Sequence, residues 1–141
     1  MPKAMLTPSV RREVAINALR LYFDGGSRPN PGAIEIAVVV RGVEHIVTGL
    51  GPGDNSDAEW MAAIHALQVA RDLGAGRVDL RGDSMLVIGQ ARGTAPCRSD
   101  SLRAHLKQFQ TAAAGFESVR LRHIGRAQNL AGIALARRHP R

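Results

Sequence analysis

The stretch LYFDGGSRPNPG, residues 21–32, decides the fold of this chain. Five of the six residues from Ala18 to Phe23 are apolar or aromatic, so we predict a buried strand there that ends at Asp24. Gly25-Gly26 and Asn30-Pro31-Gly32 are strong turn signals, and they predict that the chain reverses direction after this strand. A carboxylate next to such an apolar strand is costly without a partner, which makes Asp24 a candidate functional residue.

Two further acids occupy comparable positions. Glu59 falls in the first turn of a helix that we predict from Asp57 to Leu73, and Asp83 follows a strand that we predict from Arg77 to Gly82. Acids at strand ends and helix starts can converge on one edge of a sheet and hold divalent metal ions. Oxygen ligands without a Cys or His cluster favour Mg²⁺ or Mn²⁺ over Zn²⁺. Two such ions can activate a water and stabilise the leaving oxygen of a phosphodiester.

Each acid also has a purely structural interpretation. Asp24 before a glycine could begin a turn. Ser56 and Glu59 have the spacing of a capping box, and Asp83 before Ser84 could cap the next helix. Taken singly, each structural interpretation is the stronger one. Three such coincidences in one small basic domain favour a metal site.

The remaining pattern predicts an α/β domain with the element order β-β-β-α-β-α-α-β-α. An antiparallel meander followed by α/β units gives a mixed five-stranded sheet, with three antiparallel and two parallel strands, flanked by helices. We divide the chain into a flexible N-terminal arm, residues 1–15, and one domain, residues 16–141. The predicted strands are 18–23, 34–41, 44–50, 77–82 and 118–124, and the predicted helices are 57–73, 84–91, 100–114 and 128–138.

The composition favours a nucleic-acid partner. The chain has 19 Lys and Arg against 12 Asp and Glu, a formal net charge of +7. Aromatic residues make up only 4%, which argues against a single-strand binder that works by stacking. One cysteine, Cys97, excludes an internal disulfide, and no apolar run predicts a membrane span or a signal peptide. We therefore predict a cytoplasmic monomer without an obligate protein partner.

Four short motifs follow one another along the chain. They are Asp24-Gly-Gly-Ser27-x-x-Asn30-Pro31-Gly32, Asn55-x-x-Ala58-Glu59-x-x-Ala62, Asp83-Ser84, and His123-Ile-Gly-Arg126-Ala-Gln-Asn129 followed by Leu135-Ala136. Taken in order, these motifs resemble those of the type 1 ribonuclease H family, and their spacing matches along about residues 18–138, nearly the whole predicted domain. The segment of residues 89–107 is short and holds few Lys, so the chain looks like the compact form without the family's basic handle.

This resemblance implies a ribonuclease-H-like fold and cleavage of the RNA strand of RNA–DNA hybrids with two Mg²⁺ or Mn²⁺ ions. It implies that Asp24, Glu59 and Asp83 are catalytic metal ligands. His123 falls where many members carry a catalytic histidine, and Arg126 is the nearby arginine of compact members. The residues that the resemblance places along the hybrid are Gly25, Gly26, Ser27, Asn30, Asn55, Ser56, Ser84 and Arg126.

One departure from the family pattern concerns the last motif. The family usually has a fourth carboxylate four residues after the motif's Asn, and here that position is Ile133, with Gly132 before it. In one interpretation the enzyme works with three carboxylates, and the Asn129 side chain supplies a weak oxygen ligand one helical turn away. In the other, catalysis is lost and the domain is a binding module for hybrids or double strands. Locally, Ile133 is expected to pack in the core.

Overall fold

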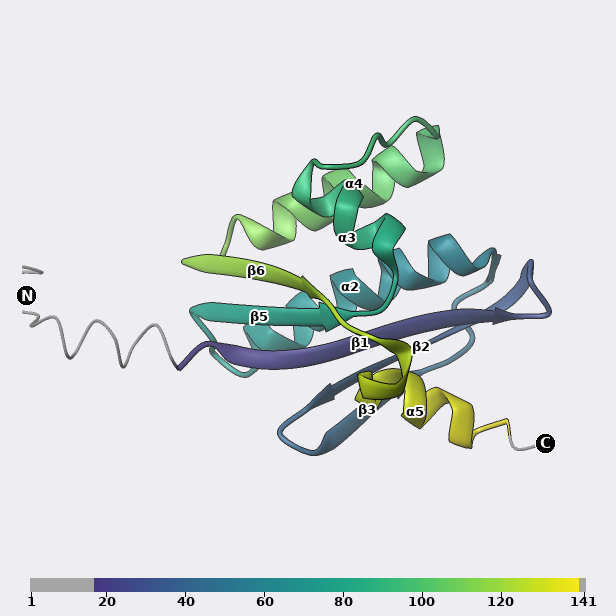
Figure 1. The fold of residues 1–141 in the computed structure, drawn as a ribbon, viewed down its shortest axis with the longest axis horizontal. Coiled ribbons are helices and arrows are strands. Elements are labelled where there is room, and N and C mark those ends of the chain that lie inside the picture. Colours follow the sequence, from purple (N-terminus) through teal and green to yellow (C-terminus); the bar gives the residue numbers. More distant parts are fainter. Residues whose placement is uncertain (1–16, 140–141) are drawn as a thin grey trace, which may run out of the picture.

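A mixed β-sheet forms the frame of the molecule in the computed structural model, which describes residues 17–139 (Figure 1). Its neighbours run in the order β3-β2-β1-β5-β6, and the short β4 pairs with β2. β1, β2 and β3 are antiparallel, whereas β5 and β6 run parallel to β1. The predicted class of sheet is thereby confirmed. The strands are β1 Leu19–Arg28, β2 Gly32–Val40, β3 Val43–Val47, β4 Pro52–Gly53, β5 Arg77–Gly82 and β6 Ser118–His123.

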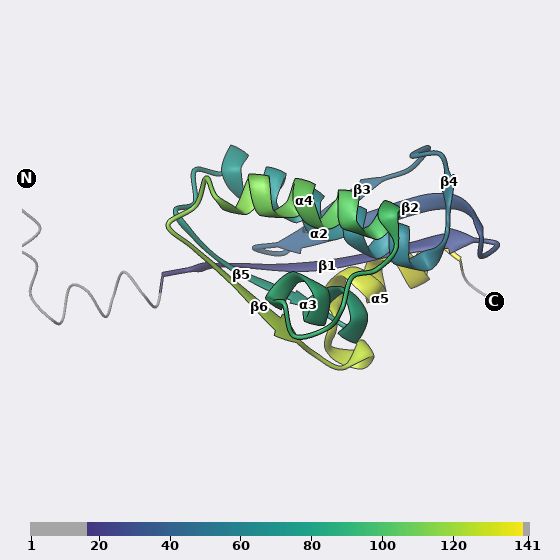
Figure 2. The same ribbon diagram turned by 90° about the horizontal axis from the view of Figure 1, so that it is seen from above.

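Helices cover the two faces of the sheet unequally. α2, α3 and α4 contact one another and share one face. α5 lies on the other face, and Figure 2 shows α2 and α4 on one side of β1 and α5 on the opposite side. α5 packs against β1, β2 and β3. The helices are α2 Asn55–Asp72, α3 Met85–Arg92, α4 Asp100–Ala113 and α5 Leu130–Arg137, with a 3-10 turn, η2, at Arg126–Gln128. None of the helices in the described range 17–139 is long and apolar enough to span a membrane.

The main hydrophobic core lies between the sheet and α2. Alternate side chains of β1 point into it, and Trp60 of α2 is fully buried there. The Trp60 ring meets Phe109 of α4 edge to face, with 5.8 Å between the ring centroids, and its indole N–H donates to Gln90. A second, smaller core lies beneath α5. These two cores pack α2 and α5 against opposite faces of β1.

The first strand is longer than its sequence predicts. β1 does not end at Asp24 but continues to Arg28, with Gly25 and Gly26 paired to residues of β2. The glycines were predicted to form a turn, yet α2 crosses β1 at this point. A Cβ on Gly25 would lie 2.1 Å from the carbonyl oxygen of Ala58, so only glycine permits the crossing. The reversal occurs later, between Arg28 and Gly32.

The first helix also begins earlier than predicted. α2 starts at Asn55, and Asp54 is its N-cap. The Asp54 side chain accepts a hydrogen bond from the Asp57 N–H at 2.8 Å, and the Asp57 side chain accepts one from the Asp54 N–H at 3.1 Å. The capping box is therefore formed by these two aspartates and not by Ser56 with Glu59. Glu59 lies beyond the first turn with its carboxylate free of any capping role.

The far end of α5 is tied to the sheet by ion pairs. His139 and Arg138 both contact Glu35 of β2, at 2.7 Å and 3.4 Å, and Arg137 pairs with Glu44 of β3. Glu35 is almost completely buried. These contacts fix the position of the helix that covers Asp24. The predicted arm, residues 1–15, and residues 140–141 lie outside the described residues.

Candidate active site

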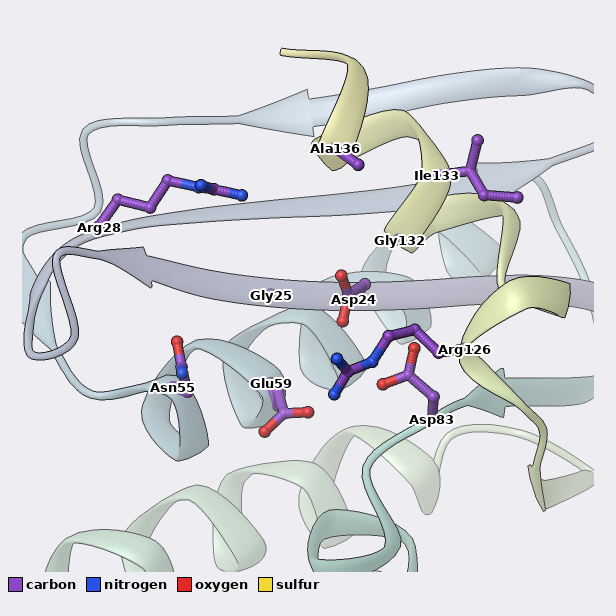
Figure 3. Close-up of a pocket in the computed structure, with 10 residues that line it drawn as sticks. All are labelled: Asp24, Gly25, Arg28, Asn55, Glu59, Asp83, Arg126, Gly132, Ile133 and Ala136. Carbon is purple, nitrogen blue, oxygen red and sulfur yellow. The ribbon is translucent and has the colours of Figure 1, made fainter. Parts of the chain in front are cut away.

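The three acids singled out in the sequence converge in one pocket. Asp24 lies in the middle of β1 on the face covered by α5, Glu59 projects from α2, and Asp83 follows β5 (Figure 3). One carboxylate oxygen from each lies within 4.8 Å of the others. The pocket around them has a volume of about 460 Å³ and is open to solvent. Three segments distant in the sequence, β1, α2 and the end of β5, thus place their carboxylates side by side.

None of the three structural interpretations of these acids applies. Asp24 is a paired strand residue opposite Ala37 and begins no turn. The cap of α3 is Ser84, whose hydroxyl accepts a hydrogen bond from the Val87 N–H at 3.2 Å, so Asp83 caps nothing. Glu59 stands outside the capping box of α2. No local backbone requirement accounts for these carboxylates, which leaves the cluster itself as their shared feature.

Asp24 is strongly affected by its surroundings. The pKa of its carboxyl is raised from 3.8 to about 7, first by burial and then by the neighbouring charges of Asp83 and Glu59. A hydrogen bond from the Gly25 backbone and the positive charge of Arg126 act in the opposite direction. The protein therefore supplies too little positive charge and too few hydrogen bonds to stabilise the ionised form of Asp24 fully.

Glu59 is affected in the same way. Burial is the largest cause that raises the pKa of Glu59 from 4.5 to about 7, followed by the charge of Asp83. A hydrogen bond from Ser84 and the charge of Arg126 lower it. Two adjacent carboxyls with raised pKa values mark a site that lacks positive charge, and a bound cation would supply it.

Asn129 anchors the acid cluster from the side of α5. Its side chain is fully buried and caps α5, because its Oδ1 accepts from the Ala131 N–H at 3.1 Å. Its Nδ2 donates to the Phe23 carbonyl and to Asp83 Oδ2, both at 3.0 Å. The Phe23 carbonyl can only accept and the Ala131 N–H can only donate, so these two partners assign the nitrogen and the oxygen of the Asn129 amide. The Asn129 oxygen is thus engaged in the cap of α5, and it is the amide nitrogen that contacts Asp83.

The sequence predicted that Ile133 packs in the core, and this prediction was wrong. Ile133 is 41% exposed and lines the pocket beside Gly132 (Figure 3). A Cβ on Gly132 would lie 3.3 Å from Asp24 Oδ2 and 3.7 Å from Asp83 Oδ2. The glycine therefore leaves free space next to two of the acids. That space and an all-oxygen donor set are suitable for a hydrated Mg²⁺ or Mn²⁺ ion.

The two basic candidates occupy different places. Arg126 lies in the pocket, and its guanidinium extends towards the acids in Figure 3. His123 does not line the pocket. It ends β6, and its Nε2 lies 3.2 Å from the carbonyl oxygen of Asp83, to which the ring N–H donates. His123 therefore holds the backbone of Asp83 rather than facing the carboxylates.

The polar residues of the first two motifs form a network at one end of the pocket. The Ser27 N–H donates to Asn55 Oδ1 at 3.0 Å, and the Asn55 N–H donates to Asn30 Oδ1 at 3.1 Å. The Ser27 hydroxyl bridges the two amides at 3.2 Å and 3.3 Å. Asn55 itself lines the pocket, as does Gly25, whereas Gly26, Ser56 and Ser84 are outside its lining.

Sequence reasoning missed Arg28 and Ala136 as lining residues. Arg28 shares a strand face with Asp24 because both lie at even spacing on β1, and its side chain reaches along the pocket in Figure 3. Arg28 could have been predicted as a pocket residue only if β1 had been expected to continue through Gly25 and Gly26. Ala136 lies about one turn beyond Ile133 on α5, so helical spacing could have found it.

Comparisons with known proteins agree with this architecture. A family model described as Reverse transcriptase-like matches residues 23–139. Ribonuclease HI of Halobacterium salinarum is 38% identical over 120 residues, which are 82% of this chain and 60% of that protein. The crystal structure of RNase H1 from the same archaeon superposes with a TM-score of 0.79 at 34% identity, covering 84% of this chain and 94% of that one.

LC11-RNase H1, solved in complex with an RNA/DNA hybrid, superposes with a TM-score of 0.74 at 26% identity, covering 79% of this chain and 88% of that one. The chain spans 60% of the length of the curated archaeal relative but nearly the whole of the archaeal crystal structure. The likeness therefore extends over the complete folded unit that holds the three acids.

Proposed function

The chain belongs to the ribonuclease H family, and we propose that it is a metal-dependent endonuclease that hydrolyses the RNA strand of RNA–DNA hybrids. The observation that carries this proposal is the convergence of Asp24, Glu59 and Asp83, whose oxygens lie within 4.8 Å of one another. The similarity to LC11-RNase H1, which was solved with a hybrid, supports the substrate.

The three carboxylates would hold the metal, and Mg²⁺ or Mn²⁺ suits their oxygen donors. Such an ion lowers the pKa of a water and stabilises charge on a leaving oxygen. The protein contributes the geometry. Asn129 orients Asp83 through its amide N–H, His123 holds the Asp83 backbone, and Ser84 donates to Glu59. Asn129 and His123 are thus positioning residues in this proposal, and Arg126 neutralises charge beside the acids.

The substrate would lie across the polar end of the pocket. Ser27, Asn30 and Asn55 are held by one another, so their remaining donors and acceptors are preorganised. Such groups can recognise a 2′-hydroxyl, which distinguishes RNA from DNA. Gly25 would line the groove with its backbone, and Gly26 would let the strand approach β1, with Ser56 and Ser84 at the edges of the same groove. Arg28 and Arg126 would contact phosphates.

Cleavage of an end-labelled RNA–DNA hybrid tests the proposal. We expect products from the RNA strand with Mg²⁺ or Mn²⁺, none with EDTA, and none from Asp83→Asn. Duplex DNA and duplex RNA offered in competition test the choice of substrate. Asp72→Asn, which removes an exposed carboxylate at the far end of α2, is the matched control and should cleave normally. Cleavage that persists in Asp83→Asn would contradict the proposed site.

The second candidate function is a non-catalytic module that binds hybrids or double strands. It is favoured by one observation, the exposed Ile133 at the position where the family usually has a fourth carboxylate. A two-ion arrangement would then lack a ligand from α5. Ile133→Asp separates the two functions: it should increase turnover and the number of Mn²⁺ ions bound if the missing ligand limits an enzyme. Hybrid binding without cleavage in wild type and variant would favour the module.

We also propose that the protein acts in the cytoplasm as a monomer. Its single cysteine, Cys97, is a free thiol, which suits a reducing compartment. Light scattering of the purified chain, alone and with a hybrid, would test the oligomeric state.

A further inference from the structure

The face of the sheet that carries α5 is open over β5 and β6. α5 packs mainly on β1, β2 and β3, and in Figure 1 none of the described helices lies in front of β5 and β6. The apolar side chains of β5 and β6 point to the other face, towards α2. Alternation therefore turns the polar residues of these strands outwards onto the open face.

These outward residues are mainly arginines. The strand register places Arg20 of β1 beside Asp79 of β5, and Asp79 beside Arg120 of β6. In the next row on this face, Arg81 of β5 lies beside Arg122 of β6. Neighbouring strands are about 4.8 Å apart, so these side chains form one surface. We call it the arginine face and define it as Arg20, Arg81, Arg120 and Arg122.

The arginine face is incompletely neutralised. Asp79 lies among these arginines and pairs with Arg81 at 3.2 Å, and the side chains of this pair are only 18% and 15% exposed. The exposed positive charges are therefore those of Arg20, Arg120 and Arg122. Within residues 17–139, Arg20, Arg120 and Arg122 form no ion pair. Arg120 and Arg122 lie two residues apart on the same side of β6, so their exposed like charges repel each other. An external anion would remove that repulsion.

A hollow of about 500 Å³ continues the arginine face towards α5. Arg20 and Tyr22 of β1 line it, Arg41 lies at its rim, and the exposed Leu130 closes the side next to α5. Arg41 adds another exposed positive charge on the same side of the sheet. A cluster of basic side chains on one face is the electrostatic signature of a nucleic-acid-binding surface.

We propose that the arginine face binds the phosphate backbone of a nucleic acid, outside the segment held at the three acids. Both sites lie on the same sheet face, since Arg81 precedes Asp83 by two residues, about 7 Å along the chain. The segment that carries η2 crosses between them. One nucleic acid can therefore contact both the pocket of the three acids and the arginine face.

Charge argues against the chain's own N-terminal segment as the occupant. Residues 1–16 contain Lys3, Arg11 and Arg12 against one acid, Glu13, so a polyanion complements the arginine face and this segment does not. The inference rests on the proposed nucleic-acid substrate, although not on cleavage. A nucleic acid is also favoured because the adjoining pocket is built for phosphodiesters.

The test is the salt dependence of binding, measured with Arg120→Gln/Arg122→Gln. Both residues are exposed on an edge strand, so the fold should tolerate the change. Binding of a fluorescein-labelled RNA–DNA hybrid is followed by anisotropy in the Asp83→Asn background, which keeps the hybrid intact. Loss of two phosphate contacts should reduce the slope of log K against log salt by about 2 and weaken binding roughly 60-fold at about 0.1 M salt.

Two further variants make the result specific. Arg71→Gln/Lys107→Gln removes the same charge from α2 and α4, on the other side of the molecule, and should change the slope little. Arg120→Lys/Arg122→Lys keeps the charge and should retain most of the affinity. In the cleaving enzyme, Arg120→Gln/Arg122→Gln should raise KM and leave kcat unchanged.

An unchanged salt slope in Arg120→Gln/Arg122→Gln would overturn the inference, and so would an equal loss in the control pair. If the wild type cleaves hybrids and the slope is unchanged, only this inference fails. If the wild type binds no nucleic acid, the proposed function fails with it. Binding to anionic lipid vesicles alone would likewise refute a nucleic-acid occupant.

Discussion

Replacing Asp24 by asparagine should stabilise the metal-free protein while it abolishes cleavage. Asp24 is held next to two other carboxylates and largely away from water, and the pKa of its carboxyl rises from 3.8 to about 7. The folded protein therefore binds a proton at Asp24 that the unfolded chain has already released at the same pH. Asparagine keeps the shape of the protonated group and carries no charge at any pH.

The sign and size of the effect follow from this difference. Between about pH 4 and pH 7 the folded state holds more protons than the unfolded state, so the free energy of unfolding falls as the pH rises. At about 1.4 kcal/mol per pKa unit, the rise from 3.8 to about 7 amounts to at most about 4 kcal/mol. The loss is complete above pH 7 and absent below pH 4.

Thermal unfolding in EDTA, followed by circular dichroism at several pH values, measures this effect. At pH 8, Asp24→Asn should melt about 10–15 °C above the wild type, and the gain should disappear near pH 4. Adding Mg²⁺ should stabilise the wild type and close part of the gap, because a bound cation replaces the missing positive charge. An Asp24→Asn protein that is less stable than the wild type at pH 8, or equally stabilised at both pH values, would refute the reasoning.

Three further predictions follow from the packing around the acids. Gly25→Ala should destabilise the fold by about 3 kcal/mol in urea unfolding, because its Cβ would meet the backbone of α2 at 2.1 Å, whereas Gly26→Ala, with open space, should cost far less. Asn129→Ala should lose about 2 kcal/mol through its cap and lower kcat by releasing Asp83. Asn129→Asp keeps the cap oxygen but places a second acceptor against the Phe23 carbonyl and Asp83, so it should also be destabilised and should not recover kcat. Mg²⁺ should raise the wild-type melting temperature, and Asp83→Asn should abolish that rise.

Much of the fold could be predicted from local signals. The two strands after α2 begin within a residue of their predicted starts, because alternating apolar residues and flanking glycines mark them clearly. The length of β1 could not be predicted, because a Gly-Gly pair occurs both in turns and where a helix crosses close to a strand. The close approach of α2, 33 residues later at Ala58, decides between the two.

The candidate site shows the same division. Spacing and residue type were enough to select Asp24, Glu59 and Asp83, and the fold places them within 4.8 Å. The direction of the Asn129 amide was not predictable, because it depends on the Phe23 carbonyl and on Asp83, both distant in the sequence. Its side chain caps α5 through the amide oxygen and contacts Asp83 through the amide nitrogen.

The sequence by itself determined the order of the elements, the identity of the three acids and the absence of a fourth carboxylate at Ile133. These properties are local, because residue type and periodicity encode them within a few turns of chain. Only the tertiary structure decided the raised pKa values of Asp24 and Glu59, the exposure of Ile133 and the joining of arginines from three strands into one face. Those properties depend on burial and on strand register, which exist only after distant segments have packed together.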